Sequence, residues 1–209
     1  MPDQKRKIEL LFVAIQTGNK EAFDALFHLY YGKLLSFARN YVQSESAEEI
    51  VSELFVALWI KRDILAEIMT PEVYLYVSVK NACLNLIRYN KKRQKIFRDK
   101  SPNEVFEHIA NTNGLLMEDK ELMHLLELAV ARLPEQRQII FRLIKDQGLK
   151  SNAVAQILGI SKRTVENQLY KALKSLAIAI SDYLGYHPQN RISRKQLLSD
   201  RSFLLFFTL

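Results

Sequence analysis

The chain has 209 residues, enough for one or two domains, and 48% of them are apolar, so it can bury substantial cores. Thirty lysines and arginines outnumber 23 aspartates and glutamates, which gives a formal net charge of +7 at pH 7. This balance excludes an acidic protein and suits a polyanionic partner such as nucleic acid, although many basic proteins bind none.

The first half of the chain has the apolar spacing of helices, and glycine and proline are scarce. One helix is predicted over residues 20–42. A second is predicted over residues 46–61, with Ser46 as its cap and with Glu48 and Glu49 near its positive N-terminal end. The apolar residues of this second helix cover more than the single stripe that one packing partner needs. It is therefore either deeply buried or shared between a core and an external partner.

A loop is expected over residues 62–70, and Pro71 is well placed to open a third helix. Residues 72–92 contain neither glycine nor proline. Two faces of this helix are predicted. The buried stripe consists of Leu75, Val79, Ala82 and Leu86. The polar face consists of Asn81, Asn85, Arg88 and Lys92.

The apolar period is lost after this third helix. Residues 88–100 hold seven basic residues against one aspartate, and a flexible linker is predicted over residues 94–117. The helical pattern then runs to about residue 184, and a polar, basic tail with an apolar end occupies residues 185–209. We therefore predict an all-α protein with two small helical domains. A lead-in over residues 1–17 comes first, and the domains cover residues 18–93 and 118–184.

The strongest motif lies in residues 151–176, which read SNAVAQILGISKRTVENQLYKALKSL. Ala155, Gly159 and Val165 have the spacing of a helix-turn-helix. A small residue lets the helices approach, glycine supplies a left-handed turn, and valine plugs the angle between the helices. Ser161 is the predicted N-cap of the second helix. The small core is completed by Val154, Leu158 and Ile160. We expect the C-terminal domain to be a four-helix domain built around this motif.

The second helix of the motif has an apolar and a polar face. Its inward residues are Val165, Leu169, Ala172, Leu173 and Leu176. Its candidate DNA-binding residues are Lys162, Arg163, Thr164, Glu166, Asn167, Tyr170, Lys171 and Lys174. Arginine and asparagine suit purine edges and lysine suits phosphates, as a major-groove reading helix requires. Some helix-turn-helix units bind only protein, but the outward charges favour DNA.

Three stretches in order resemble the extracytoplasmic-function (ECF) subfamily of the sigma-70 family of RNA polymerase sigma factors. Residues 47–59 read AEEIVSELFVALW and resemble its polymerase-docking helix. Residues 74–88 read YLYVSVKNACLNLIR and resemble its promoter-opening helix. Residues 133–173 resemble its C-terminal DNA-reading domain. The KRD stretch after Trp59 and the YLYVSVKN wording look closest to the branch abundant in Bacteroidetes.

The resemblance implies a division of labour on core RNA polymerase. The N-terminal domain would dock on the clamp of the largest subunit and capture an unpaired base of the minus-ten element beside the 61–71 loop. The C-terminal domain would rest on the flap of the second-largest subunit and read the minus-thirty-five element. The implied polymerase contacts are Glu48, Glu49, Glu53, Leu54, Leu58 and Trp59. The implied minus-ten contacts are Tyr74, Tyr76, Lys80, Asn81, Asn85, Arg88 and Lys92. For each tyrosine, core packing is an equal alternative.

Several positions depart from the family pattern. Ser46 and Ser52 replace the usual Asp and Gln of the docking helix, Val77 stands where the opening helix often has Arg, and Ala153 replaces a common Glu. These changes leave the scaffold intact but weaken the assignment of individual contacts. The resemblance also implies an anti-sigma factor as a partner, while the tail after residue 184 has no family counterpart.

Two other functions were weighed. A helix-turn-helix regulator of the LuxR or response-regulator kind would not dock on polymerase, but the helical periods of residues 1–92 argue against its α/β upstream domain. An enzyme is disfavoured because no phosphate loop, nucleophile elbow or paired-carboxylate motif is present. The four histidines fall in no ligand spacing, so neither a metal nor a cofactor is expected.

The single cysteine, Cys83, allows no internal disulfide and is expected to be a small core residue in a reducing compartment. The N-terminal sequence lacks the apolar core of a signal peptide. The longest apolar run of the tail, Phe203 to Phe207, is far shorter than the ~20 residues that span a bilayer. We therefore expect a cytoplasmic protein without membrane insertion.

Overall fold

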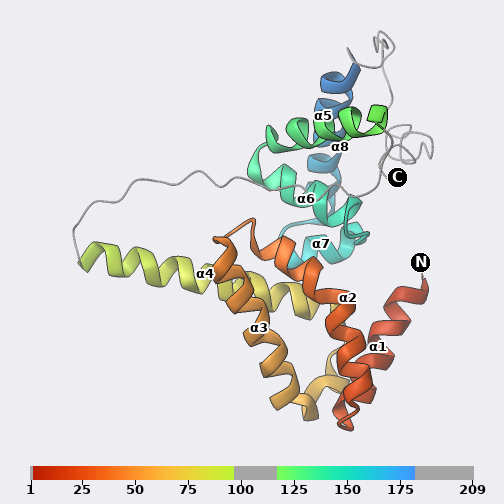
Figure 1. The fold of residues 1–209 in the computed structure, drawn as a ribbon, viewed down its shortest axis with the longest axis vertical. Coiled ribbons are helices and arrows are strands. Elements are labelled where there is room, and N and C mark those ends of the chain that lie inside the picture. Colours follow the sequence, from red (N-terminus) through yellow and green to blue (C-terminus); the bar gives the residue numbers. More distant parts are fainter. Residues whose placement is uncertain (1, 97–116, 182–209) are drawn as a thin grey trace. The chain divides into compact units, whose positions relative to one another are not determined.

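A computed structural model describes the backbone of residues 2–96 and 117–181 (Figure 1). Within these ranges every regular element is a helix, as predicted. The chain divides into two compact units, unit 1 (residues 1–104) and unit 2 (residues 105–209). The predicted linker lies mostly outside the described residues, and the predicted tail lies wholly outside them.

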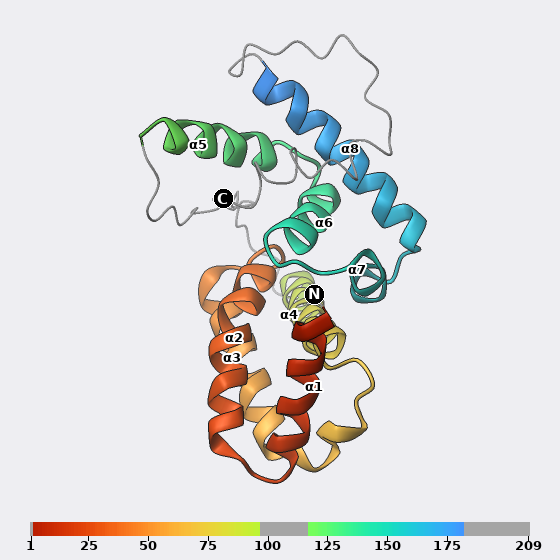
Figure 2. The ribbon, with the colours of Figure 1, turned by 90° about the vertical axis from the view of Figure 1, so that its right-hand side faces the viewer.

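The described residues of unit 1 form a bundle of four α-helices and one short 3-10 helix. Its elements are α1 (Pro2–Gln16), α2 (Lys20–Ala38), α3 (Ser44–Ile60), η1 (Arg62–Glu67) and α4 (Pro71–Ile96). Helix α2 packs against α1, α3 and α4, and η1 lies against α1 (Figure 2). The largest fully buried side chains of the unit include Tyr30, Tyr76, Phe12 and Phe37.

Helix α1 corrects the prediction that residues 1–17 are only a lead-in. Ile8, Phe12 and Ile15 are at most 1% exposed and face the core of unit 1 at spacings of four and three. The Gln16 side chain donates a hydrogen bond from Nε2 to the backbone oxygen of Asp63 at 2.6 Å. Helix α1 is therefore an integral part of the bundle, attached to η1 as well as to α2.

The start of α2 is capped as helix chemistry favours, but the predicted cap of α3 is wrong. Asn19 Oδ1 accepts a hydrogen bond from the backbone N–H of Ala22 at 2.7 Å. Helix α3 begins at Ser44 with Gln43 in the cap position and no side-chain cap bond. Ser46 lies inside the first turn of α3, so its hydroxyl is too far along the helix to cap it.

Helix α4 starts at Pro71 as predicted, and it continues to Ile96, beyond the expected start of the linker at residue 94. The expected loop before it contains the 3-10 helix η1, whose Leu65 is 1% exposed. Of the predicted buried stripe, Leu75 and Val79 are buried, whereas Ala82 and Leu86 are only half-buried. Cys83 completes the stripe, and its burial raises the pKa of the thiol to about 11.

Unit 2 contains four described helices, as predicted: α5 (Met117–Ala131), α6 (Glu135–Lys145), α7 (Ser151–Leu158) and α8 (Lys162–Ser181). Helix α8 packs against the other three. All five inward residues predicted for α8 are buried, from Val165 to Leu176. The last residues of the predicted helical stretch, beyond Ser181, lie outside the described part of the chain.

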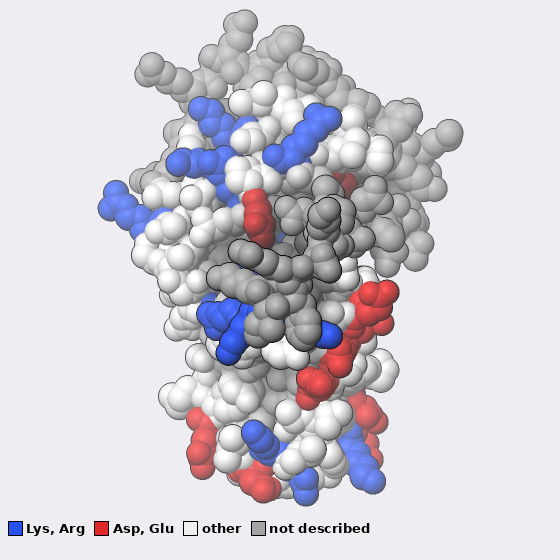
Figure 3. All heavy atoms as spheres, turned by 90° about the vertical axis from the view of Figure 1, so that its left-hand side faces the viewer, with Lys and Arg blue, Asp and Glu red and all other residues white. Residues whose placement is uncertain are grey.

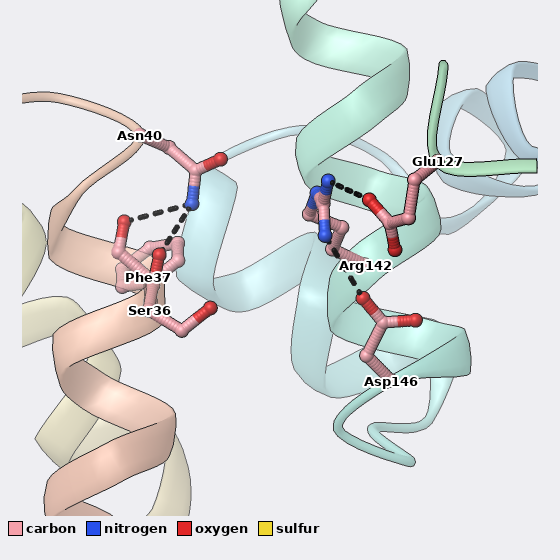
Figure 4. Close-up of polar contacts among 6 residues, drawn as sticks. All are labelled: Ser36, Phe37, Asn40, Glu127, Arg142 and Asp146. Atoms are coloured by element: carbon pink, nitrogen blue, oxygen red, sulfur yellow. Dashed lines mark hydrogen bonds and ion pairs between the residues drawn. The ribbon is translucent and has the colours of Figure 1, made fainter. Parts of the chain in front are cut away.

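Polar contacts of two side chains, Asn40 and Arg142, add to the packing of the helices (Figure 4). In unit 1, the Asn40 side chain donates to the backbone oxygens of Ser36 and Phe37 and closes the end of α2. In unit 2, Arg142 Nη2 lies 2.9 Å from Glu127 Oε2 and links α6 to α5. Its Nη1 lies 3.5 Å from Asp146 Oδ2 at the end of α6. Among the helices that the structure describes, none has the length and hydrophobicity to cross a membrane.

Candidate nucleic-acid and polymerase interfaces

The turn between α7 and α8 has the geometry predicted for a helix-turn-helix. Gly159 adopts φ 72°, ψ 35°, the left-handed conformation that side chains resist, and its N–H donates to the oxygen of Ala155 at 2.9 Å. The next helix is capped as predicted, because the backbone N–H of Thr164 donates to Ser161 Oγ at 3.0 Å. Val165 is fully buried, in agreement with its predicted place between the helices.

The polar face of α8 is open to solvent at its first two turns. Lys162 and Arg163 are exposed, while Glu166 and Asn167 are half-exposed. Lys162 Nζ lies 3.6 Å from Glu166 Oε1, one turn apart on the same face. Farther along, Tyr170 is half-exposed and Lys171 and Lys174 are exposed. Thr164 differs from the other candidates, because its hydroxyl is 2.8 Å from Ser161 Oγ and belongs to the cap.

The polar face predicted for α4 is present in unit 1. Asn81, Asn85, Arg88 and Lys92 are all exposed, and Arg88 Nη1 donates to Asn85 Oδ1 at 3.1 Å. The C-terminal half of α4 projects beyond the rest of the unit (Figure 1). After Glu72 this helix contains no acidic residue, so its exposed face is electropositive.

The two tyrosines near the start of α4 have different places. Tyr74 is half-exposed and remains available to a ligand. Tyr76 is 0% exposed, and its ring meets Phe37 edge-on at 5.2 Å between centroids. Burial, together with the charge of Glu72, holds the pKa of Tyr76 well above its usual range. The assignment of Tyr76 as a DNA contact is therefore wrong in this conformation, and its role is core packing.

Helix α3 has a core side and an acidic side. Leu58 is 2% exposed and cannot touch polymerase from this position, so its assignment as a docking residue is wrong. Leu54 is half-buried, and Trp59 packs on Phe23 at 5.1 Å between ring centroids. The implied docking residues that are exposed on α3 are Glu48, Glu49 and Glu53. Glu48 pairs with Arg39, the residue that follows α2, at 3.2 Å.

Exposed apolar side chains also lie on α3, but at positions that the sequence analysis did not single out. Val56 is 58% exposed and Ile60 is 66% exposed, one turn apart. Ile64 of η1 is 50% exposed. Helix α3 therefore exposes apolar side chains, but not the residues from which a surface wider than one stripe was predicted. Ser52, Val56 and Ile60 follow one another at a spacing of four and share one face of the helix. A search for apolar residues on the face of the polar Ser52 would have found the other two.

Two helices of unit 1, α3 and α4, carry charges of opposite sign. Helix α3 contains only acidic charges, whereas the exposed charges of α4 beyond its first turn are basic. In Figure 3, acidic side chains form a diagonal band on the right of the lower half of the view, and other acidic side chains lie among basic ones below it. Because DNA is a polyanion, α4 suits DNA and α3 suits a protein partner. Within the described ranges no group of side chains is arranged to hold a metal ion.

Comparisons with known proteins give each unit a family. Residues 26–93 match sigma-70 region 2, and residues 123–176 match sigma-70 region 4. The ECF RNA polymerase sigma-E factor of Escherichia coli strain K12 is 23% identical over 175 residues, which cover 80% of this chain and 91% of that protein. The sigma-E factor of Haemophilus influenzae is 22% identical over 170 residues, 78% of this chain and 90% of that protein.

A solved structure of CnrH in complex with the cytosolic domain of CnrY has a similar fold. It matches with a TM-score of 0.51 at 18% identity and covers 83% of this chain and 97% of that one. The two sigma-70 regions together cover more than half of the chain, and one lies within each of its two units. The chain therefore belongs to the sigma-70 family, as a DNA-binding sigma factor that directs the initiation of transcription.

Proposed function

We propose that the sigma factor assigns docking to α3, promoter opening to α4 and upstream-element reading to α8. The single observation that carries this division is the separation of charge on exposed helix faces. Helix α3 exposes acids and apolar side chains, α4 exposes asparagines and bases, and α8 exposes Arg163 and Asn167 beside a capped N-terminus. The surface of α3 suits a protein partner, and the surfaces of α4 and α8 suit promoter DNA.

The docking surface consists of Glu49, Glu53, Val56 and Ile60 on one side of α3, which we propose binds the clamp of the largest polymerase subunit. An apolar centre with charged neighbours is typical of a protein interface, because the apolar residues supply burial and the charges supply specificity. The acidic charge also disfavours contact with DNA. Unit 2 would rest on the flap of the second-largest subunit.

The opening surface consists of Tyr74, Asn81, Asn85, Arg88 and Lys92 on α4. An unpaired base needs stacking and hydrogen-bonding partners to offset the few kcal/mol that extrusion costs. Tyr74 offers a half-exposed ring, and the asparagines offer donors and acceptors. The basic residues at the projecting end of α4 would hold the phosphates.

The wider setting follows from the same function. We propose that the protein works in the cytoplasm, where polymerase and promoters are found. CnrH was solved with the cytosolic domain of a second protein, which supports an anti-sigma partner here. The KRD stretch at residues 61–63 supports placement in the Bacteroidetes branch.

Co-purification from cells tests polymerase docking and separates this proposal from a helix-turn-helix regulator that does not bind polymerase. Tagged full-length protein should recover the two large polymerase subunits. A Glu53→Lys variant should recover much less, and Glu45→Lys, one of the exposed acids nearer the start of α3, should recover the normal amount. Recovery of no polymerase by the unaltered protein would favour the regulator.

A further inference from the structure

Arg137 of α6 makes a long-range hydrogen bond to the reading helix α8. Its Nε donates to Gln168 Oε1 at 3.0 Å, across 31 residues of sequence. Both side chains are half-buried, so water competes only in part for the bond. We propose that Arg137 is a positioning residue for promoter recognition, which acts through Gln168 by fixing the rotation of α8 about its own axis.

The place of Gln168 on α8 suits this role. It lies three residues after Val165 and four before Ala172, both fully buried, so it borders the core face. Asn167 precedes it directly and lies toward the outward face. Apolar contacts keep the helices together but are non-directional, whereas a hydrogen bond at the edge of the face opposes rotation.

A small rotation would be enough to abolish a base contact. Side-chain tips lie about 5–6 Å from a helix axis, so a turn of about 20° moves them by about 2 Å. A hydrogen bond to a base edge tolerates only a few tenths of an ångström around ~2.9 Å. Lysine contacts to phosphate are flexible and survive such a movement. Loss of the Arg137 bond should therefore reduce sequence-specific binding and spare non-specific binding.

Arg142 supplies a matched comparison on the same helix. Within the described residues, the ion pairs of Arg142 join it to Glu127 of α5 and to Asp146, and not to α8 (Figure 4). Breaking the Arg142–Glu127 pair should loosen the attachment of α5 without rotating the reading helix. This inference rests on the proposed reading role of α8, which the two arginines let us test separately from the stability of unit 2.

The experiment uses the full-length protein assembled with core polymerase and two duplexes. One duplex is the sequence that the unaltered complex selects from a random pool, and the other is a scrambled version. Arg137→Ala and Gln168→Ala should each lower the ratio of the two affinities about tenfold, the effect of losing one base contact. The double variant should lose no more than the larger single loss. Gln168→Glu keeps the acceptor oxygen and should keep the ratio.

Three results would overturn the inference. The first is an unchanged ratio of the affinities for the selected and scrambled duplexes in Arg137→Ala. Both affinities could fall equally with a shallower salt dependence, which would make Arg137 a phosphate contact. The control Glu127→Gln could lower the ratio as much as Arg137→Ala, which would indicate general loosening of unit 2. If the unaltered complex selects no sequence, the reading function fails together with the inference. If it selects one and the variants keep the ratio, only the inference fails.

Discussion

At the start of α8, Arg163 is exposed and Asn167 half-exposed, and both lie within two turns of the Ser161 cap. Guanidinium and amide groups can each make two hydrogen bonds to a purine edge. Arg163→Ala or Asn167→Ala should therefore weaken binding of the polymerase complex to the upstream element by about 1–3 kcal/mol. Titration with a labelled duplex measures the loss.

Lys171 and Lys174 provide the contrasting case, because exposed lysines on the same helix suit phosphates. Replacing either by Ala should weaken binding to all sequences alike and reduce the salt dependence by about one ion. Full-strength, sequence-specific binding by both the Arg163 and the Asn167 variants would remove α8 as the reading element.

Asp146 at the end of α6 makes the stability of unit 2 depend on pH. Burial raises its pKa to about 6 against the lowering effect of Arg142, and Glu127 adds to the rise. Because folding raises the pKa of Asp146, the protonated form of this side chain stabilises the folded state. This stabilisation is present below about pH 4 and is lost as pH rises through about 6. About half of the side chain, 48%, remains exposed, so the effect is small.

Asp146→Asn mimics the protonated group and should raise the melting temperature more at pH 7.5 than at pH 4.5. Thermal unfolding followed by circular dichroism measures this difference. Glu135→Gln, at an exposed carboxylate on the same helix, is the control for the removal of one negative charge from α6. An Asn variant that melts below the unaltered protein at both pH values would show that the Arg142 ion pair outweighs burial.

At the scale of elements, substitutions on α4 should impair promoter opening, whereas substitutions on α8 should impair binding to the upstream element. Asn81→Ala and Asn85→Ala change exposed side chains on α4, so both variants should fold normally. In complex with polymerase they should separate the promoter DNA strands less. Permanganate footprinting of the polymerase complex on a cognate promoter detects unpaired thymines directly. Binding of the same complexes to the upstream element should be unchanged. Normal opening by both variants would remove α4 from this step.

Helix α3 should determine polymerase affinity. Val56→Asp replaces an apolar side chain that is already 58% exposed with a charged one, so the variant should fold but should no longer bind core polymerase. Leu58→Asp should instead unfold unit 1, because Leu58 is 2% exposed. Circular dichroism beside a polymerase-binding assay separates the two outcomes. Normal binding by a folded Val56→Asp variant would contradict the docking surface.

Some of these helices and their roles could be predicted from the sequence, and others were assigned wrongly. The helix-turn-helix was predictable in detail, because Gly159 and Ser161 are held by local chemistry. Tyr76 and Leu58 were assigned to partners from motif position, yet they face the core. Tyr76 shares a face with Val79 and Cys83, and Leu58 with Val51 and Phe55, so helical spacing alone predicts their burial. Assigning α1 required the same spacing count on Ile8, Phe12 and Ile15.

At the scale of the whole molecule, the proposed docking surface and the two proposed DNA-binding surfaces are distributed over two units that each have their own core. Such a division allows both promoter elements to be bound at once, and each contact raises the effective concentration of the other. The predicted linker over residues 94–117 should be the first site of limited proteolysis in the full-length protein. Cleavage within α2 or α8 before any cut in that window would contradict the predicted domain boundary.

The most direct test of the central claim is run-off transcription with core polymerase on genomic fragments, with and without the full-length protein. The account predicts discrete new transcripts that depend on the protein. These transcripts should disappear in the double variant Asn81→Ala with Asn85→Ala, and also in the double variant Arg163→Ala with Asn167→Ala. Transcripts identical to those of core polymerase alone would contradict it, as would new transcripts that persist unchanged in both pairs of variants.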